Sequence, residues 1–435
     1  MRTSRLQPVI PTEYGHPMTT DRVQATYLIE TPWPLAEAAE TLAGEQSSGT
    51  FVAVPGETEE LRERFRARLE NVQELESAAA PSLPGVKMPE GQTQFHRARI
   101  GVSFSLENMG TNLPALVSTI AGNLFELREF SGLRLLDFEL PQAFAEDHAG
   151  PQFGISGTRQ LTGVQGRPII GTIVKPSVGL TPAQTAELAG ELAAAGVDFI
   201  KDDELMANPP HSPLKERVQA VMPVLNAHAD RTGKKVMYAW NISDSLDAMY
   251  RHHDVVATAG GTCVMVSLNS VGLVGTEALR KHSKMPIHGH RNGWGMLSRH
   301  PALGIDFPAY QKLWRLVGVD QLHVNGLQNK FAEDDESVVR SIKACLKPFL
   351  GGYELMPVIS SGQWGGQAPE TYRQAGTVDL MYLAGGGIMA HPKGPAAGCR
   401  AIRQAWEAAA AGVELTRFAE QHEELRISLE TFGRG

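Results

Sequence analysis

The 435-residue sequence has only three cysteines, Cys263, Cys345 and Cys399. They are odd in number and far apart, which argues against a disulfide framework and against a zinc site built from cysteines. We therefore expect the protein to work in the cytoplasm, and we interpret Cys263 and Cys399 as packing residues.

Long apolar runs and basic blocks are also missing. No run approaches the ~18 apolar residues of a membrane span, and the opening segment MRTSRLQPVIPTEYGHP lacks the apolar centre of a secretory signal. The net charge is -8, without a cluster of Lys and Arg suited to nucleic acid. We expect neither a membrane nor a nucleic-acid partner, so any basic groups that bind a phosphate must be local.

The first 150 residues mix strand and helix patterns without a regular alternation. We predict strands at 21–32, 49–56 and 96–109, helices at 33–46 and 58–75, and a loop at 77–94. Such a mixture indicates a small α+β domain.

From about residue 165, short apolar runs alternate with longer segments of helical spacing. Eight runs are found, at 167–177, 197–204, 235–243, 261–269, 285–292, 320–326, 354–362 and 378–387. Continuous apolar runs suit parallel strands that are buried on both faces, and eight of them suit a closed barrel. A doubly wound sheet is the alternative, but its phosphate-binding fingerprint is missing. The predicted fold is α/β: a C-terminal (β/α)8 TIM barrel over 151–435 after a ferredoxin-like α+β domain over 1–150.

Nearly every one of these runs ends in polar residues or glycines. They are Lys175, Lys201, Asp203, Glu204, Asn241, Asn269, His288, His290, Arg291, His323, Asn325, Ser360, Ser361, Gly385, Gly386 and Gly387. One polar strand end is explained by loop capping. Repetition around the barrel instead predicts an active site at the carboxyl ends of the strands.

The segment FIKDDE, residues 199–204, carries the densest charge. Strand alternation places Lys201 and Asp203 on one face, with Glu204 at the tip. One interpretation is an internal salt bridge between the lysine and a carboxylate. The other is a hard-cation site in which Lys201 carries CO2 as a carbamate, since a plain ammonium would repel the metal that two carboxylates attract.

Several motifs resemble, in order and spacing, the large-subunit RuBisCO superfamily. They are KPSVGL, GVDFIKDDE, HGHRNG, LHVNG, PVISSG and AGGGIMAHPKGPAAG, together with EQSSGTF and AGNLF nearer the N-terminus. The resemblance covers most of the chain. It implies that Lys201 is carbamylated and binds Mg2+ together with Asp203 and Glu204, that Lys175 handles protons at the reacting carbon, and that His290 lies over the sugar hydroxyls.

The resemblance also implies two phosphate-binding sets in a site that two subunits share. One set is Arg291, His323 and Ser360; the other is Thr50, Gly362, Gly385 and Gly386. Lys330 resembles the lysine of a mobile loop, with Glu45 as its partner, and Asn123 matches an asparagine near the metal. In the family Glu45, Thr50 and Asn123 come from the neighbouring subunit, so a homodimer that acts on a small sugar phosphate is implied.

The sequence departs from true RuBisCO at informative positions. Ser177 replaces a second lysine in KPS, Phe51 replaces a tryptophan, and the loop around Lys330 lacks the usual flanking pattern. CO2 fixation is therefore not expected, and the chain resembles a RuBisCO-like protein of form IV.

Among RuBisCO-like branches, the methionine-salvage enolases carry a lysine where this chain has Asn123, and the methylthioribulose phosphate isomerases use a lysine where it has Ser177. A third branch acts on 3-oxo-isoapionate 4-phosphate, by decarboxylation or by transcarboxylation and hydrolysis, and does not obviously need either lysine. We favour this branch and leave its two reactions open. The alternatives are an enolase or isomerase of a methylthio-pentose phosphate with a relocated base, and a non-catalytic regulator that binds a phosphate ligand.

Overall fold

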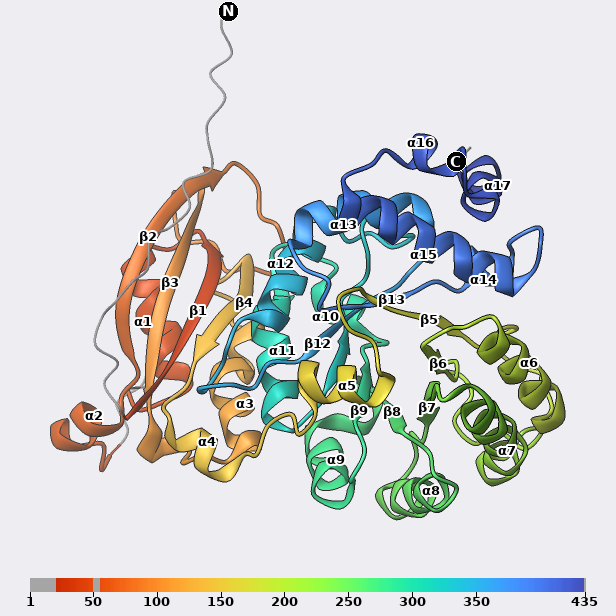
Figure 1. Cartoon of the computed structure of the whole chain (residues 1–435). Helices are drawn as coiled ribbons and strands as arrows, with labels where there is room; N and C mark the ends of the chain where they lie inside the picture. The colour runs from red at the N-terminus through yellow and green to blue at the C-terminus, as the bar shows by residue number, and fades with distance from the viewer. Residues whose placement is uncertain (1–20, 50–54, 434–435) are drawn as a thin grey trace, which may run out of the picture.

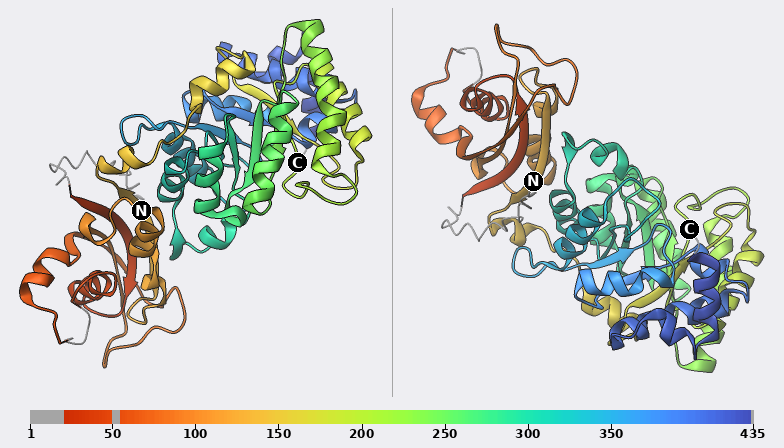
Figure 2. Two further views of the ribbon diagram at one scale, coloured as in Figure 1. Left: turned by 90° about the horizontal axis from the view of Figure 1, so that it is seen from below. Right: turned by 90° about the horizontal axis from the view of Figure 1, so that it is seen from above.

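The computed structural model describes residues 21–49 and 55–433. Figure 1 shows two parts, a smaller sheet domain beside a barrel, and the two views of Figure 2 show that they lie side by side in an elongated molecule. Among the described residues, no helix is long and apolar enough to cross a membrane.

The N-terminal domain is built on an antiparallel sheet. Its own strands are β1 (Arg22–Thr31), β2 (Arg68–Ala78), β3 (Phe95–Ser105) and β4 (Gly132–Glu139), in the order β4-β1-β3-β2. Val23, Ala25, Tyr27 and Ile29 alternate along β1 as buried residues, as expected of a strand with one face in a core. Helices α1 (Leu35–Glu45) and α3 (Leu113–Ala121) complete the ferredoxin-like order, which confirms the predicted domain type.

The helix predicted at 58–75 is confirmed only in its first part, and the remainder is strand. Helix α2 (Glu59–Phe65) begins after Thr58, whose side chain accepts from the amide of Leu61, and β2 follows immediately. Leu69, Val72 and Leu75 have helical spacing, but β2 lies at the edge of the sheet with most side chains exposed, and its register with β3 decides its structure. The strand predicted at 49–56 lies mostly outside the described residues.

The C-terminal part is a closed barrel of eight parallel strands, and every predicted run contributes one. They are β5 (Ile169–Ile173), β6 (Phe199–Lys201), β7 (Met237–Asn241), β8 (Cys263–Ser267), β9 (Ile287–His290), β11 (Gln321–His323), β12 (Met356–Ile359) and β13 (Met381–Leu383), and β13 pairs with β5 to close the ring. Buried side chains such as Phe199, Met237, Met265 and Met381 fill the interior. The barrel is therefore packed below its mouth.

Helices surround the barrel and close one end of it (Figure 1). The helices that connect or follow the barrel strands are α6 (Pro182–Ala194), α7 (Leu214–Thr232), α8 (Leu246–Thr258), α9 (Leu268–His282), α10 (Trp294–Ser298), α11 (Phe307–Leu316), α12 (Asp335–Leu346), α13 (Ala368–Ala375), α14 (Gly386–Met389) and α15 (Pro395–Ala411). The short α4 (Ala143–Asp147) links the domains, and α16 (Leu415–Ala419) and α17 (Glu423–Phe432) end the fold. Helix α5 (Gly154–Thr162) precedes β5, and its Ile155 and Leu161 pack on the interior cluster, so α5 forms the barrel floor.

One strand that the sequence analysis missed joins the two domains. β10 (Leu303–Ile305), in the connection between β9 and β11, pairs in parallel with β4. The buried Arg134 on β4 donates to the carbonyls of His300 and Leu303 at 2.7 and 2.9 Å and pairs with Asp306 at 2.5 Å. These contacts fix the sheet domain to the side of the barrel.

Candidate active site

The charged residues that follow β5 and β6 meet at the barrel mouth. Lys201, the last residue of β6, is 1% exposed, and its Nζ lies 3.6 Å from Oε2 of Glu204 and donates to the Asp202 carbonyl at 2.9 Å. Burial lowers the pKa of Lys201, against the attraction of Glu204, Asp203 and Asp202. A buried amine with nearby carboxylates is therefore the central feature of the site.

Lys175, which follows β5, faces the same group. Its Nζ donates to Oδ2 of Asp203 at 2.8 Å and to the hydroxyl of Ser177 at 2.7 Å. Burial disfavours the charged form of Asp203, but the hydrogen bonds from Lys175 and from the Leu205 amide outweigh it and hold the pKa of Asp203 below its usual value. The salt bridge that the sequence allowed thus exists, and it involves Lys175 as well as Lys201.

The third carboxylate of the run points away from the mouth. Asp202 accepts from the Arg217 guanidinium and from the backbone N–H of Asn241, both at 3.0 Å, and from the Tyr238 hydroxyl at 2.7 Å. Arg217 and Asp202 are both buried. Alternation along the chain turns Asp202 to the face opposite that of Lys201 and Asp203. Asp202 therefore has a structural role.

Asn241, at the end of β7, holds the backbone that carries the two remaining carboxylates. Its side-chain nitrogen Nδ2 donates to the backbone carbonyls of Asp203 and Glu204 at 3.2 and 3.1 Å, and its side-chain oxygen Oδ1 accepts from the Ser243 hydroxyl at 2.8 Å. Asn241 was noticed in the sequence only as a polar strand end. Its effect is to set the direction of both carboxylates.

Histidines from β9 and β11 form the next part of the mouth. His290 Nε2 lies 3.5 Å from Oε2 of Glu204, and the rings of His290 and His323 are 4.5 Å apart. Burial, together with the nearby Lys201, lowers the pKa of His290 to about 3, and burial lowers the pKa of His323 well below its ordinary value. Both rings are therefore neutral near pH 7.

Arg291 is held beside these histidines by a residue that the sequence analysis did not single out. Its Nη2 donates to Oε2 of Glu333 at 2.7 Å, while its buried Nη1 has no hydrogen-bond partner among the described residues. The rings of Trp294 and Phe307 lie 5.4 and 5.1 Å from the guanidinium carbon. The unpaired N–H donors on Nη1 suit an anion.

Glycines bring two further loops to the mouth. A Cβ at Gly385 would lie 4.0 Å from Cε of Lys175, and one at Gly362 would lie 3.8 Å from Cβ of Lys330. Gly362 also has a φ of +88°, which favours glycine. Lys330 is exposed, its amide donates to the Ser361 carbonyl at 3.3 Å, and its ammonium lies 5.3 Å from the centre of the Phe331 ring. The loops after β11, β12 and β13 thus surround the lysines.

Two of the expected site residues, Glu45 and Asn123, are not joined to this group. Glu45 ends α1, which contacts β2, β3 and the short helix η2 (Asn123–Glu126) that begins at Asn123. In the described part of the chain, neither Glu45 nor Asn123 hydrogen-bonds to a residue of the barrel mouth. Thr50 lies outside the described residues. Among the described residues of one chain, the side chains that meet at the mouth all come from the barrel.

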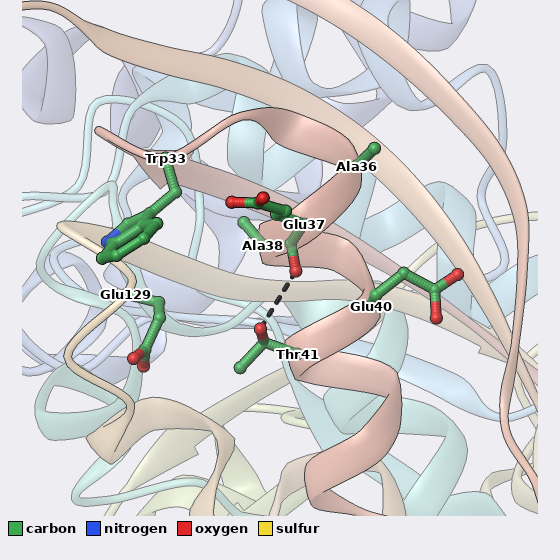
Figure 3. A pocket seen from close by; sticks show the side chains of 7 residues that line it. All are labelled: Trp33, Ala36, Glu37, Ala38, Glu40, Thr41 and Glu129. Atoms are coloured by element: carbon green, nitrogen blue, oxygen red, sulfur yellow. Dashed lines mark hydrogen bonds between the residues drawn. The ribbon is translucent and has the colours of Figure 1, made fainter. Parts of the chain in front are cut away.

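Two other features lie away from the mouth. A hollow of about 410 Å³ on α1 is lined by Trp33, Glu37, Glu40, Thr41 and Glu129 among others, and its three carboxylates disfavour a phosphate (Figure 3). His253, Asp254 and His282 are close enough to share a metal ion, but they lie on the outer helices α8 and α9. Neither feature contributes to the site at the strand ends.

Comparison with known proteins agrees with this geometry. Residues 16–144 match the N-terminal domain, and residues 154–432 the catalytic domain, of the ribulose bisphosphate carboxylase large chain. A 3-oxo-isoapionate-4-phosphate decarboxylase of Rhizobium etli is 52% identical over 95% of this chain and 99% of its own. A 3-oxo-isoapionate-4-phosphate transcarboxylase/hydrolase of Xanthobacter autotrophicus is 54% identical over 94% and 99%.

The solved structure of a RuBisCO-like protein from Burkholderia fungorum is 48% identical and covers 95% of this chain and 100% of its own. It superposes with a TM-score of 0.89. The domain matches, the relatives and the solved structure indicate the same family as the motifs at the strand ends. The chain therefore belongs to the RuBisCO large-chain family and, within it, is a RuBisCO-like protein.

Proposed function

We propose that this protein is an Mg2+-dependent enzyme that breaks a carbon–carbon bond of 3-oxo-isoapionate 4-phosphate, by decarboxylation or by transcarboxylation and hydrolysis. The observation that carries the proposal is the contact of Lys175 with Asp203, which holds a proton donor beside a candidate metal ligand. The substrate is supported by the relatives from Rhizobium etli and Xanthobacter autotrophicus, which are named for activities on 3-oxo-isoapionate 4-phosphate.

The donor set fits a magnesium ion and a carbamate. Asp203 and Glu204 offer hard oxygen ligands, and a carbamate on Lys201 would add a third and replace its positive charge. The lowered pKa of Lys201 favours the free amine, which is the form that adds CO2. When bound, Mg2+ would polarise the substrate's keto and hydroxyl oxygens and stabilise negative charge on them.

Each residue of the mouth then has a chemical task. Loss of the carboxylate from the β-keto acid leaves its bonding electron pair in an enolate, and Lys175 returns a proton to that carbon. His290, neutral and beside Glu204, binds a substrate hydroxyl. Lys330 neutralises the departing carboxylate when its loop covers the site. The phosphate lies against Arg291 or against the glycine loops at 362 and 385–386.

The site is completed by a second subunit in this proposal. Asn123 and Glu45 lie in the N-terminal domain, and their described contacts leave them separate from the mouth of their own barrel. A homodimer in which each N-terminal domain supplies Asn123, Glu45 and Thr50 to the partner's barrel would bring these residues to the substrate. The chain by itself would then have no complete site.

The proposal is tested by incubation of the purified protein with 3-oxo-isoapionate 4-phosphate, Mg2+ and bicarbonate, followed by phosphorus and carbon NMR. A tetrulose phosphate with CO2 identifies the decarboxylase, and phosphoglycerate with glycolate identifies the hydrolase. Substrate that stays unchanged with Mg2+ present would overturn the proposal and favour a methylthio-pentose phosphate or a binding role.

A further inference from the structure

A line of hydrogen bonds runs through the packed barrel from its floor to its mouth. Thr158 on α5 contacts Gln321 at 3.2 Å, and Gln321 contacts His288 Nδ1 at 2.8 Å. His288 Nε2 lies 2.9 Å from His323 Nε2, and His323 Nδ1 lies 2.9 Å from the Ser360 hydroxyl. All five side chains are buried, and Thr158, His288 and Gln321 have no exposed surface.

The floor end of this line sets the direction of its hydrogen bonds. The Thr158 hydroxyl donates to the Gly154 carbonyl at 2.6 Å, so its oxygen can only accept from Gln321. The amide nitrogen of Gln321 therefore faces Thr158 and, at 3.4 Å, the sulfur of Met237, while its oxygen faces His288. Because that oxygen only accepts, His288 carries its proton on Nδ1.

The remaining two links follow from the first two. A neutral His288 with its proton on Nδ1 has an acceptor at Nε2, so His323 must donate from its own Nε2. His323 Nδ1 is then an acceptor, and the Ser360 hydroxyl donates to it. Burial supports neutral rings, because it lowers the pKa of His288 to about 3 and the pKa of His323 well below its ordinary value.

We propose that Thr158, Gln321 and His288 are positioning residues, which fix the tautomer of His323 and thereby leave the Ser360 oxygen as an acceptor for a substrate hydroxyl. In this arrangement neither the His323 ring nor the Ser360 hydroxyl has a hydrogen left for a phosphate. Within the expected set of Arg291, His323 and Ser360, the side-chain donor without a partner is then the buried Nη1 of Arg291. The class of substrate rests on the proposed function, whereas the assigned tautomers of His288 and His323 do not depend on it.

The test is Thr158→Val, which keeps the side-chain shape and removes the hydroxyl that orients Gln321. Histidine-selective nitrogen-15 NMR of the wild-type protein should show His323 protonated on Nε2, with its signal assigned by replacing single histidines. The variant should show a mixture of tautomers at His288 and His323. The KM for the keto-sugar phosphate should rise about three- to tenfold, the value of one hydrogen bond, with kcat nearly unchanged.

Thr162→Val is the matched control. Thr162 lies one turn along the same helix and is buried, and its hydroxyl donates to the carbonyls of Thr158 at 2.9 Å and Arg159 at 3.2 Å rather than to Gln321. It should leave both the tautomers and KM unchanged. If Thr158→Val does not fold, Gln321→Met removes the same link.

Wild-type His323 protonated on Nδ1 would overturn the proposal, as would a Thr158→Val protein indistinguishable from Thr162→Val. The NMR measurement needs no substrate. Absence of turnover with the expected substrate would therefore count against the proposed function and leave the tautomer result standing.

Discussion

Lys175 donates a 2.8 Å hydrogen bond to Asp203, across the tips of two neighbouring barrel strands. The pairing follows from the register of β5 and β6, in which Ile173 lies opposite Lys201. It stabilises the charged form of Asp203 and holds the Lys175 ammonium at the mouth. A proton donor and a metal ligand are thus fixed in one contact.

Replacement of Lys175 by Met should lower kcat by about 10²- to 10⁴-fold, because it removes the proton donor. Ser177→Ala removes only the second partner of the ammonium, which lies at 2.7 Å, and should lower kcat by about threefold or less. Steady-state kinetics of the two variants compare these effects. Equal losses would contradict the assignment of Lys175.

Lys201→Met should abolish Mg2+-dependent turnover, with a loss of about 10³-fold or more. The side chain is fully buried, so methionine fills its volume and the melting temperature should not fall. Lys234→Met is the control, since Lys234 pairs with Asp198 at 2.6 Å, away from the mouth residues. Retained activity in Lys201→Met would exclude the carbamate.

Asn241→Leu should raise the Mg2+ concentration needed for half-maximal activity about 10- to 100-fold, because the amide no longer fixes the backbone of Asp203 and Glu204. Asn269→Leu removes a comparable amide, which donates to the Asn292 carbonyl at 2.8 Å. The control should leave the Mg2+ dependence unchanged. A titration with Mg2+ at saturating substrate distinguishes the two.

Arg217→Met should destabilise the fold by about 3 to 5 kcal/mol, because it leaves Asp202 as a buried, uncompensated charge. It also removes the donors to the carbonyls of Ser212, Met206 and Ala207, in the loop that follows Glu204. Denaturant unfolding measures the loss. The double variant with Asp202→Asn should recover part of it, and no recovery would contradict the pairing.

Two inactive variants should complement each other if subunits share sites. A mixture of Asn123→Ala and Lys201→Met chains, refolded or expressed together, would place an intact barrel against an intact Asn123 in half the sites of each mixed dimer. Random pairing then restores about a quarter of the wild-type activity. Sites formed within single chains would give none.

The strand pattern was sufficient to predict the barrel and the presence of Lys201, Asp203 and Glu204 at its mouth, whereas their role as metal ligands stays a prediction. The eight apolar runs and the alternation of Lys201, Asp202 and Asp203 are local signals, and the structure follows them. β2 was misread because its exposed, charged side chains have the spacing of a helix, and because its pairing partners on β3 lie 17 to 35 positions further along the sequence. β10 was missed because three residues are too few for a pattern.

The residues that support the site were harder to predict, for the same reason. Glu333 and its partner Arg291 are 42 positions apart in the sequence, and Gln321 and its partner His288 are 33 positions apart. Both contacts depend on which strands become neighbours. The register of β9 and β11, which places Gln321 opposite His288, could have indicated the second contact once the barrel order was assumed.

The proposed reaction is cleavage of a carbon–carbon bond at the centre formed by Lys175, Lys201 and Asp203. The most direct measurement follows 3-oxo-isoapionate 4-phosphate, labelled with carbon-13 in its carboxylate, by carbon NMR with Mg2+ and bicarbonate present. The label should leave the original skeleton, as CO2 and bicarbonate or in a smaller acid, and Lys175→Met should prevent this. A label that stays on the intact skeleton, with or without proton exchange at the neighbouring carbon, would contradict the proposed reaction.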